Sequence, residues 1–548
     1  MQITLNGKTI TLNEGARYVD AVKTMYPDTE KSVLGIRIGG RTVSLEEKVD
    51  DDVCAHTLAL SDEEGRRMYE RSLRFILLLA MRELHPAARV RVENSTQLGV
   101  RLTVDGVTMN VESVRHIENK MRELIAKDLP YEKMVISRKE AMALFKKQGE
   151  MDKVRLLAYR PHEHFQVYQC VGMPEYFYGE MVPSTGYTSV FALRFQLPDI
   201  ELQLPDLHNE AKPGSMVDSP MLRHTFAEST VWGKILGCEN TADLNEMVEN
   251  KKIREFIRIN EALHEKSISE IADAFVKSGA QLVLIAGPSS SGKTTFANRL
   301  SIQLRVRGLR PMKVSMDDYY IDREKIPLEA DGKPDLERLD TLDVERFNED
   351  LVELLQGKAV NAPLFDFKAG KRSEKTHRMH PEAGQPIIVE GIHALNDELT
   401  HQVPRDKKFL IYISALTTLN LDDHNRIRTT DARLLRRMVR DHLFRGTPPE
   451  ETMDMWDSVR RGEHNYIFPF QECADVMFNS TLLYEMVVLK KYAYPMLMKV
   501  KPENEQYTRA YRLVKFLNYI QSTDVEDEIP QTSILREFIG GCTFYRNE

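Results

Sequence analysis

The segment Gly287-Pro-Ser-Ser-Ser-Gly-Lys-Thr294 restricts the fold of this chain more than any other part of its sequence. It matches G-x-x-x-x-G-K-[ST] at every fixed position. The apolar run Gln281 to Ala286 precedes it, and a segment of helical character, Thr295 to Leu304, follows it. In a strand–loop–helix unit of this kind, backbone N–H groups and the positive end of the helix dipole surround phosphate oxygens. The sequence therefore predicts a phosphate-binding loop.

The side chains of this loop have separate expected roles. Lys293 is placed to reach the β- and γ-phosphates of a nucleotide, and Thr294 to hold Mg²⁺. A glycine- and serine-rich turn without a ligand is the alternative, and the match of both motif and context argues against it. The residues expected to bind the nucleotide are Gly287, Ser289, Ser290, Ser291, Gly292, Lys293, Thr294 and Thr295.

Short apolar runs alternate with helical stretches from residue 281 onward, which predicts a parallel α/β sheet. Ligands bind at the carboxyl ends of the strands in such sheets. Asp317 lies where the segment 314–318 reads as a strand end, so it can accept a proton from an attacking hydroxyl and contribute to a metal site. Glu390 ends the apolar run 386–390 and is expected to help bind Mg²⁺, directly or through water. A solvated carboxylate on a loop or helix cap is the alternative for each.

A basic helix is predicted at residues 431–445, and most of its arginines share one face through i, i+3 and i+4 spacing. Two interpretations fit this pattern equally well. The helix is either a lid that neutralises a migrating phosphoryl group, or a solvated face that pairs with Asp431 and Asp441. The arginines are Arg433, Arg436, Arg437, Arg440 and Arg445.

Length and composition exclude several classes of protein. A chain of 548 residues predicts three or four domains. The net charge of −8 gives no general basic excess of the kind that nucleic-acid binders carry. The apolar run Phe75 to Met81 is far shorter than the ~20 residues of a membrane span, so we expect no membrane association. Five cysteines without a CxxC pair indicate reduced thiols and a cytoplasmic location.

Residues 281–500 resemble the uridine kinase branch of the uridine kinase/phosphoribulokinase family. Besides the phosphate loop, the matching motifs are S-M-D-D-Y-Y at 315–320, L-D-T-L-D at 339–343, P-L-F-D-F at 363–367, V-E-G-I at 389–392 and R-L-L-R-R-M-V-R-D at 433–441. The resemblance implies transfer of the ATP γ-phosphoryl group to a nucleoside 5′-hydroxyl, with ATP and Mg²⁺ as cofactors, and it suggests a homo-oligomer.

The resemblance also implies the roles of individual residues. Asp317 would be the catalytic base, and Lys293, Arg440 and Arg445 would stabilise the phosphates. Thr294 and Glu390, with Asp317, would attend Mg²⁺. The nucleoside would be lined by Tyr320, Asp340, Arg372 and Arg437, with Asp340 on the ribose hydroxyls.

Three positions depart from the family pattern. Phe365 stands where the family has a tyrosine, residues 368–371 lack the histidine that reads the pyrimidine, and Thr447 replaces a second lid arginine. A pocket without base-reading donors loses polar discrimination, so the phosphate chemistry is expected to be retained while preference for uridine is weakened.

Residues 1–200 resemble the N-terminal half of threonyl-tRNA synthetases. The first 60 look like the ubiquitin-like TGS module, and the next 140 look like the editing domain through D-E-E-G at 62–65 and G-E-M-V-P at 179–183. The four positions that carry His and Cys in the editing site hold Arg71, Phe75, Phe177 and Met181 here. Without a base or metal ligand, this domain is expected to be a non-catalytic module that binds RNA or nucleotides.

The predicted architecture is a multidomain α/β protein with a ubiquitin-like β-grasp domain, an α+β editing-like domain and a C-terminal P-loop NTPase-type kinase domain with a parallel sheet. We expect a nucleoside kinase that acts on a nucleoside or a similar small hydroxyl acceptor. The alternatives are a kinase for another hydroxyl-bearing metabolite, and an ATP-binding regulator that senses RNA or nucleotides. The expected domain boundaries are 1–61, 62–204, 205–278 for a linker and helical connector, 279–500, and 501–548 for a C-terminal extension.

Overall fold

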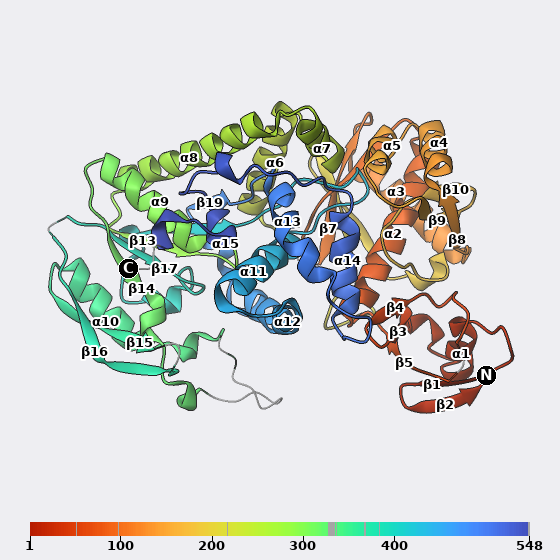
Figure 1. Cartoon of the computed structure of the whole chain (residues 1–548), viewed down its shortest axis with the longest axis horizontal. Helices are drawn as coiled ribbons and strands as arrows, with labels where there is room; N and C mark the ends of the chain where they lie inside the picture. The colour runs from red at the N-terminus through yellow and green to blue at the C-terminus, as the bar shows by residue number, and fades with distance from the viewer. Residues whose placement is uncertain are drawn as a thin grey trace.

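The molecule extends from a small mixed sheet at the N-terminal end to a parallel sheet at the other end (Figure 1). The computed structural model describes residues 1–50, 52–96, 98–215, 217–326, 335, 337–366, 369–382 and 384–545. The multidomain α/β architecture predicted from the sequence is confirmed. Among the described residues, no helix is both long enough and apolar enough to cross a membrane.

The N-terminal sheet has the strand order β2-β1-β5-β3-β4, and one helix packs on it. The Asn6-Gly7 pair, a dipeptide that favours two-residue hairpins, forms the turn between β1 and β2, and both residues adopt the positive φ (49° and 78°) that this turn requires. β1 pairs antiparallel with β2 and parallel with β5, as in a β-grasp sheet. The elements are β1 (Gln2–Leu5), β2 (Lys8–Thr11), α1 (Tyr18–Met25), β3 (Gly35–Ile38), β4 (Arg41–Val43) and β5 (Val53–Leu58).

The second region is built around α2 (Glu63–Leu84), which is buried along most of its length. A four-stranded sheet, β11-β12-β7-β6, and a three-stranded sheet, β10-β9-β8, contribute side chains to the same core. The other elements are β6 (Arg89–Ser95), β7 (Gly99–Asp105), α3 (Val111–Ala126), β8 (Glu132–Ser137), α4 (Arg138–Gln148), α5 (Met151–Ala158), β9 (His164–Cys170), β10 (Met173–Glu175), β11 (Ala192–Gln196) and β12 (Asp199–Gln203).

Three helices lead from this region into a five-stranded parallel sheet of order β14-β17-β13-β18-β19. Alternate side chains of β13 enter two different cores, Val283 and Ile285 on one face and Leu282 and Leu284 on the other. The connecting helices are α6 (Pro220–Ile235), α7 (Thr241–Glu249) and α8 (Ile253–Ser278). The strands are β13 (Leu282–Ala286), β14 (Met312–Ser315), β17 (Ile387–Glu390), β18 (Lys408–Ser414) and β19 (Val476–Asn479).

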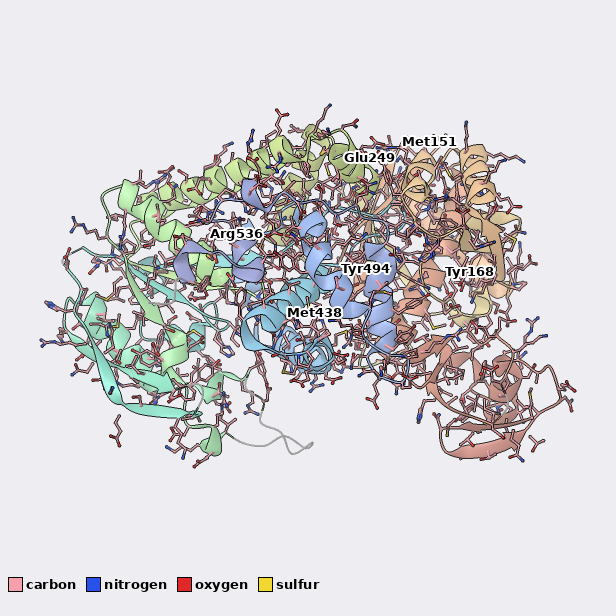
Figure 2. The ribbon with its side chains drawn as sticks, in the orientation of Figure 1. Met151, Tyr168, Glu249, Met438, Tyr494 and Arg536 are labelled. Atoms are coloured by element: carbon pink, nitrogen blue, oxygen red, sulfur yellow. The ribbon has the colours of Figure 1, made fainter. Side chains whose placement is uncertain are left out.

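Helices cover both faces of the parallel sheet, and a two-stranded hairpin extends from it (Figure 1). Met438 of α11 (Thr429–Arg445), labelled in Figure 2, belongs to the core on one face and has no exposed surface. The surrounding elements are α9 (Lys293–Val306), α10 (Val344–Leu355), β15 (Val360–Asp366), β16 (Lys371–Met379), α11 (Thr429–Arg445), α12 (Pro449–Tyr466) and α13 (Glu485–Leu497). The helix predicted at 431–445 is therefore present as α11.

The C-terminal segment connects the two ends of the molecule. α14 (Tyr507–Leu517) packs against the N-terminal region, where Arg509 pairs with Glu63 at 2.6 Å. α15 (Arg536–Ile539) packs against α11, and its Glu537 accepts the hydroxyl of Thr295, next to the phosphate loop. The segment therefore contacts both the editing-like region and the phosphate loop.

Ile411 of β18 tests the contribution of the sheet core, because it has no exposed surface and its strand lies between β13 and β19. Truncation to alanine leaves a cavity, so Ile411→Ala should lower the free energy of unfolding by about 2–5 kcal/mol. Ile411→Val, which removes a single methylene group, should cost about 0.5–1.5 kcal/mol. Urea titration followed by tryptophan fluorescence measures both changes. Equal losses in the two variants would contradict tight packing around this side chain.

Candidate active site

The loop 287–294 has the strand–loop–helix context that its sequence predicts. β13 ends at Ala286, and α9 begins at Lys293. Gly292 and Ser290 adopt positive φ values of 88° and 59°, which turn the backbone inward. Gly287 allows close approach of the loop to β18, because an added Cβ atom would lie 2.0 Å from the backbone oxygen of Ile413. Glycine is therefore required at both fixed positions of the motif.

The interior of the loop carries polar groups that fit a phosphate ligand. The hydroxyl oxygens of Ser290 and Ser291 are buried and have no hydrogen-bond partner in the part of the chain that the structure describes. The Lys293 ammonium group donates to the backbone oxygens of Gly287 at 2.9 Å and Pro288 at 3.3 Å. Burial lowers the pKa of Lys293, and neighbouring carboxylates, Glu390 foremost, counteract this effect. Unpartnered hydroxyls beside a desolvated ammonium group are suited to anionic oxygens.

Thr294 and Glu390 form the pair expected for a divalent cation. The Thr294 hydroxyl donates to Glu390 Oε1 at 2.7 Å, which leaves the hydroxyl lone pairs available. Glu390 is the last residue of β17, the strand next to β13, so the two strand ends bring it to the loop. Burial raises the pKa of Glu390, and Lys293 opposes this shift. Hydroxyl and carboxylate oxygens are the donors that Mg²⁺ prefers, so this pair fits the ion.

Asp317 lies at the carboxyl end of β14, but the strand does not reach it. β14 ends at Ser315, and residues 316–319 form a 3₁₀ turn. The strand end expected at Asp317 is therefore replaced by a 3₁₀ turn that holds both Asp317 and Asp318. The two still differ in surroundings, because Asp318 Oδ1 accepts the backbone N–H of Phe365 at 3.5 Å. Asp317 is exposed beyond the carboxyl end of β14, where partial desolvation of its carboxyl raises its pKa and Lys293 opposes the rise.

The residues predicted to line an acceptor separate into two groups. Arg372 donates to the backbone oxygen of Tyr320 at 3.2 Å, so it holds the turn that follows Asp317. The Tyr320 ring lies 5.8 Å from that of Phe365, and the pKa of its hydroxyl is raised by burial. Asp340 is half exposed and accepts from Arg338 at 2.9 Å. The structure thus brings Tyr320 and Arg372 together beside Asp317, whereas Asp340 is engaged by a neighbouring cation.

The arginines of α11 are neither all solvated nor all directed at a ligand. Arg433 and Arg436 have at most 1% exposed surface and form buried ion pairs with Glu463 and Glu485. Their guanidinium groups also contact the backbone of the phosphate loop, Arg433 at the oxygen of Ser289 (2.9 Å). Both interpretations of the helix were therefore incomplete, since these two side chains have a structural role.

The remaining three arginines of α11 converge on Asp441. Arg437 lies 3.2 Å from this carboxylate and also donates to Ser289 Oγ at 3.0 Å, which places it at the phosphate loop. Arg440 and Arg445 pair with Asp441 at 3.1 and 3.2 Å, and the Arg445 side chain is largely exposed. The predicted pairing with Asp441 is therefore present, while Asp431 pairs with arginines outside the helix.

Four further residues lie at this site that the sequence motifs did not identify as functional. Glu463 accepts the backbone N–H of Ser289 at 3.1 Å, and Glu537 accepts the hydroxyl of Thr295 at 2.7 Å. Burial raises the pKa of Glu337, with Lys293 counteracting, and lowers that of His393 to about 4, so His393 is neutral at physiological pH. Only His393, three residues after Glu390, could have been suggested by its position after a strand end.

The four editing positions of the N-terminal half are occupied by packed side chains. Phe75 stacks on Tyr131 with ring centroids 5.6 Å apart, and Phe177 meets Phe75 edge-on at 5.8 Å. Phe177 and Met181 each have 1% exposed surface. Arg71 donates to the backbone oxygen of Glu180. No base and no metal ligand remains at these four positions.

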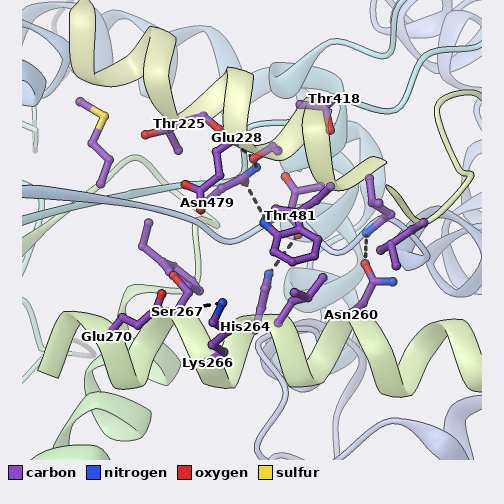
Figure 3. Close-up of a pocket in the computed structure, with 17 residues that line it drawn as sticks. Thr225, Glu228, Asn260, His264, Lys266, Ser267, Glu270, Thr418, Asn479 and Thr481 are labelled. Atoms are coloured by element: carbon purple, nitrogen blue, oxygen red, sulfur yellow. Dashed lines mark hydrogen bonds and ion pairs between the residues drawn. The ribbon is translucent and has the colours of Figure 1, made fainter. Parts of the chain in front are cut away.

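A cavity between α6, α8 and β19 lies apart from the phosphate loop (Figure 3). His264 of α8 lines it and donates from Nε2 to the backbone oxygen of Thr481 at 3.1 Å. Burial lowers the pKa of His264 to about 3, so this side chain is neutral. None of the described residues that line the cavity belongs to the phosphate loop or to the carboxylates around it.

Comparison with known proteins gives a separate match for each half of the chain. Residues 282–484 match the model of the Phosphoribulokinase / Uridine kinase family. A uridine kinase of Bacillus pumilus is 31% identical over 203 residues, which are 37% of this chain and 87% of that protein. A structure described as a possible uridine kinase from Bacillus stearothermophilus is 21% identical and covers 38% of this chain and 98% of that one, with a TM-score of 0.26.

The N-terminal region matches a different enzyme. A threonine–tRNA ligase of Desulforamulus reducens is 30% identical over 187 residues, which are 32% of this chain. The match spans only 29% of the ligase. Both resemblances seen in the sequence are thus confirmed, and the identity to a uridine kinase of which 87% is covered shows that this chain belongs to the phosphoribulokinase/uridine kinase family.

Proposed function

We propose that this chain transfers the γ-phosphoryl group of ATP to a hydroxyl group of a nucleoside. The observation that supports this proposal best is the convergence of three strand ends. Lys293 follows β13, Glu390 ends β17, and Asp317 follows β14, and these three strands are neighbours in the sheet. A phosphate loop, a metal-binding pair and a separate carboxylate are the parts that phosphoryl transfer requires.

The phosphate loop would bind and orient ATP. Lys293 and the buried hydroxyls of Ser290 and Ser291 would contact phosphate oxygens, and Arg437 and Arg440 would add positive charge from α11. Mg²⁺, held by Thr294 and Glu390 with Asp317, supplies charge neutralisation of the phosphates when bound. Arg437 contacts the loop directly, so its proposed role moves from the nucleoside to the phosphates.

Asp317 would accept the proton of the acceptor hydroxyl as the hydroxyl oxygen attacks the γ-phosphorus, while the bond from that phosphorus to the bridging oxygen of the β-phosphate breaks and ADP leaves. Its raised pKa makes the carboxylate a stronger base, because a base works best when its pKa is nearer the working pH. Asp318, with a backbone N–H bound to its carboxylate, would not take this role. An ATP-binding regulator without catalysis would not need such a base.

The acceptor would bind beside Asp317. Tyr320 and Phe365 present aromatic surface beside Asp317, which suits the flat base of a nucleoside. The base-reading position that corresponds to Gly370 has no side chain, while residues 367 and 368 lie outside the described residues. Another hydroxyl-bearing metabolite remains the second candidate, because Asp340 is engaged by Arg338 instead of standing open for ribose hydroxyls.

A panel of nucleosides and sugars assayed by ADP release tests the proposal. We expect ADP release that depends on a nucleoside and on Mg²⁺, with rates for uridine and adenosine that differ by less than the ~10⁴-fold of a hydrogen-bonding base pocket. Lys293→Ala should abolish release, because the loop loses its cation. ADP release that occurs with a sugar but not with a nucleoside would favour the second candidate. ADP release by Lys293→Ala at the wild-type rate would refute a P-loop kinase.

The adjacent pair Asp317 and Asp318 provides a matched test of the base. Asp317→Asn keeps the size of the side chain but cannot accept a proton, so single-turnover transfer should fall by about 10²–10⁴-fold while ATP affinity changes little. Asp318→Asn should retain most activity, because its carboxylate binds a backbone N–H. Single-turnover rates and ATP binding are measured for both variants. If Asp318→Asn is inactive while Asp317→Asn is active, Asp318 is the base and Asp317 is not.

The pH dependence of the rate tests the same carboxylate. The base must be ionised, and its pKa is raised above the ordinary 3.8, so kcat/KM should fall at a pH above 3.8 as the solution is acidified. Asp318 contributes to this rise by charge repulsion, so Asp318→Asn should move the acidic limb to lower pH. A pH–rate profile of the wild type and this variant is the measurement. If the acidic limb of the pH–rate profile instead moves to higher pH in Asp318→Asn, Asp317 is not the group whose titration causes that limb.

A further inference from the structure

A second cavity lies where α2 of the editing-like region meets the segment that leads into α11. Its charged lining comes from three parts of the chain that are distant in sequence: α2, residues 425–428 and α14. The cavity shares no residue with the phosphate loop or the carboxylates around it. Six arginines line it: Arg67, Arg71, Arg74, Arg426, Arg428 and Arg512.

Two of these arginines are neutralised by carboxylates. Arg67 donates to Glu63 at 2.6 Å and pairs with Asp431 at 3.3 Å. Arg512 pairs with Asp431 at 3.0 Å and also contacts Glu64. Both arginines therefore have carboxylate partners that offset their charge.

Three of the other four arginines share a single carboxylate, that of Glu70. Arg428 lies 2.5 Å from it, Arg426 lies 3.6 Å and Arg74 lies 3.7 Å. Arg71 pairs with no carboxylate of the described chain and contacts only the backbone oxygen of Glu180. The cavity therefore carries four guanidinium groups against one negative charge.

This excess positive charge is buried. Arg71, Arg74 and Arg426 have 7%, 7% and 6% exposed surface. Burial lowers the pKa of Arg71 to about 10 and that of Arg426 to about 9, so both still carry a proton at neutral pH. Buried charges without counter-charges are strongly destabilising, which makes this arrangement costly unless an anion completes it.

Unused donors point to the same conclusion. The Nε–H groups of Arg74 and Arg426 are buried and have no acceptor among the described residues. Buried donors are nearly always paired in folded proteins. Guanidinium groups that approach from several elements match an anion with several oxygens better than a single-atom ion or a flat carboxylate.

We infer that this arginine cavity binds a phosphoryl group, either free phosphate or the end of a phosphorylated metabolite. A dianionic tetrahedral group would offset most of the excess charge and offer acceptors to the unpaired Nε–H groups. Arg71, which stands at one of the four editing positions, then has a function suited to its charge.

The helix α11 connects this cavity to the phosphate loop. Arg428 is the residue directly before α11, and Asp431 in the first turn of α11 is bound by Arg67 and Arg512. Further along the same helix, Arg437 contacts Ser289 of the loop. The anion would thus lie at the end of a helix that reaches the candidate active site.

Calorimetric titration of the full chain with inorganic phosphate tests the inference at constant ionic strength. The variant Lys293→Ala serves as the background, because it weakens phosphate binding at the loop. In this background we expect saturable binding of one phosphate. Glycerol 3-phosphate forms the second arm: binding of both ligands supports a phosphorylated metabolite, and binding of phosphate alone supports the free ion.

Matched variants in the same background locate the binding. Arg71→Gln and Arg426→Gln should each weaken phosphate at least tenfold, the loss expected from one charge-assisted contact. Glu70→Gln should instead strengthen binding, because it removes the competing carboxylate. Arg115→Gln, on the exposed surface of α3, should leave the affinity unchanged.

The outcomes separate a ligand site from a structural cluster. No saturable binding of phosphate or glycerol 3-phosphate in the Lys293→Ala background would overturn the inference. Binding that is the same in Arg71→Gln, Arg426→Gln and Arg115→Gln would overturn it as well. Thermal unfolding of each variant without ligand checks folding, and the opposite effect of Glu70→Gln keeps the test decisive if one arginine variant fails to fold. None of these measurements depends on the proposed kinase activity.

Discussion

The buried ion pair between Arg433 and Glu463 supports the conformation of the phosphate loop. Glu463 accepts the backbone N–H of Ser289, and Arg433 donates to the backbone oxygen of the same residue. The backbone of Ser289 is therefore held through both its N–H and its carbonyl oxygen, by side chains of α12 and α11. Both side chains have at most 1% exposed surface, so removing either partner would leave an unpaired buried charge. The geometry offered to phosphates depends on this pair as much as on the glycines of the motif.

Charged contacts also join the N-terminal half to the family domain. Arg89 pairs with Asp423, and buried Lys153 lies 3.0 Å from Glu175 and 2.7 Å from His424. An interface made of buried charges requires precise geometry, because each charged group must contact its partner to offset the free-energy cost of desolvation. The editing-like region is therefore an integral part of the molecule and not a loosely attached module.

The C-terminal segment contributes to the same region from the opposite side. Ile534 lies so close to the phosphate loop that a Cβ atom on Gly292 would meet its side chain at 2.5 Å. Glu537 accepts the hydroxyl of Thr295 directly after the motif. The extension expected from residue 501 onward thus forms part of the wall around the loop, and together with α14 it bridges the two halves.

The sequence by itself determined the features that depend on a few consecutive residues. The phosphate loop, the hairpin at Asn6-Gly7, the helix α11 and the carboxylate at the end of β17 follow from local backbone preferences and periodicity. Asp317 follows a strand, as its sequence context indicated, although the 3₁₀ turn that carries it was not predicted.

Only the tertiary structure decided which charges meet. Arg433, Arg437 and Arg428 look alike in the sequence, yet one is a buried support, one contacts the loop and one lines a separate cavity. One of the two interpretations of the basic helix paired Asp431 with arginines of that helix, yet it binds arginines from α2 and α14. The physical reason is that the partner of a buried charge is set by packing between segments hundreds of residues apart, which no local pattern of the chain encodes.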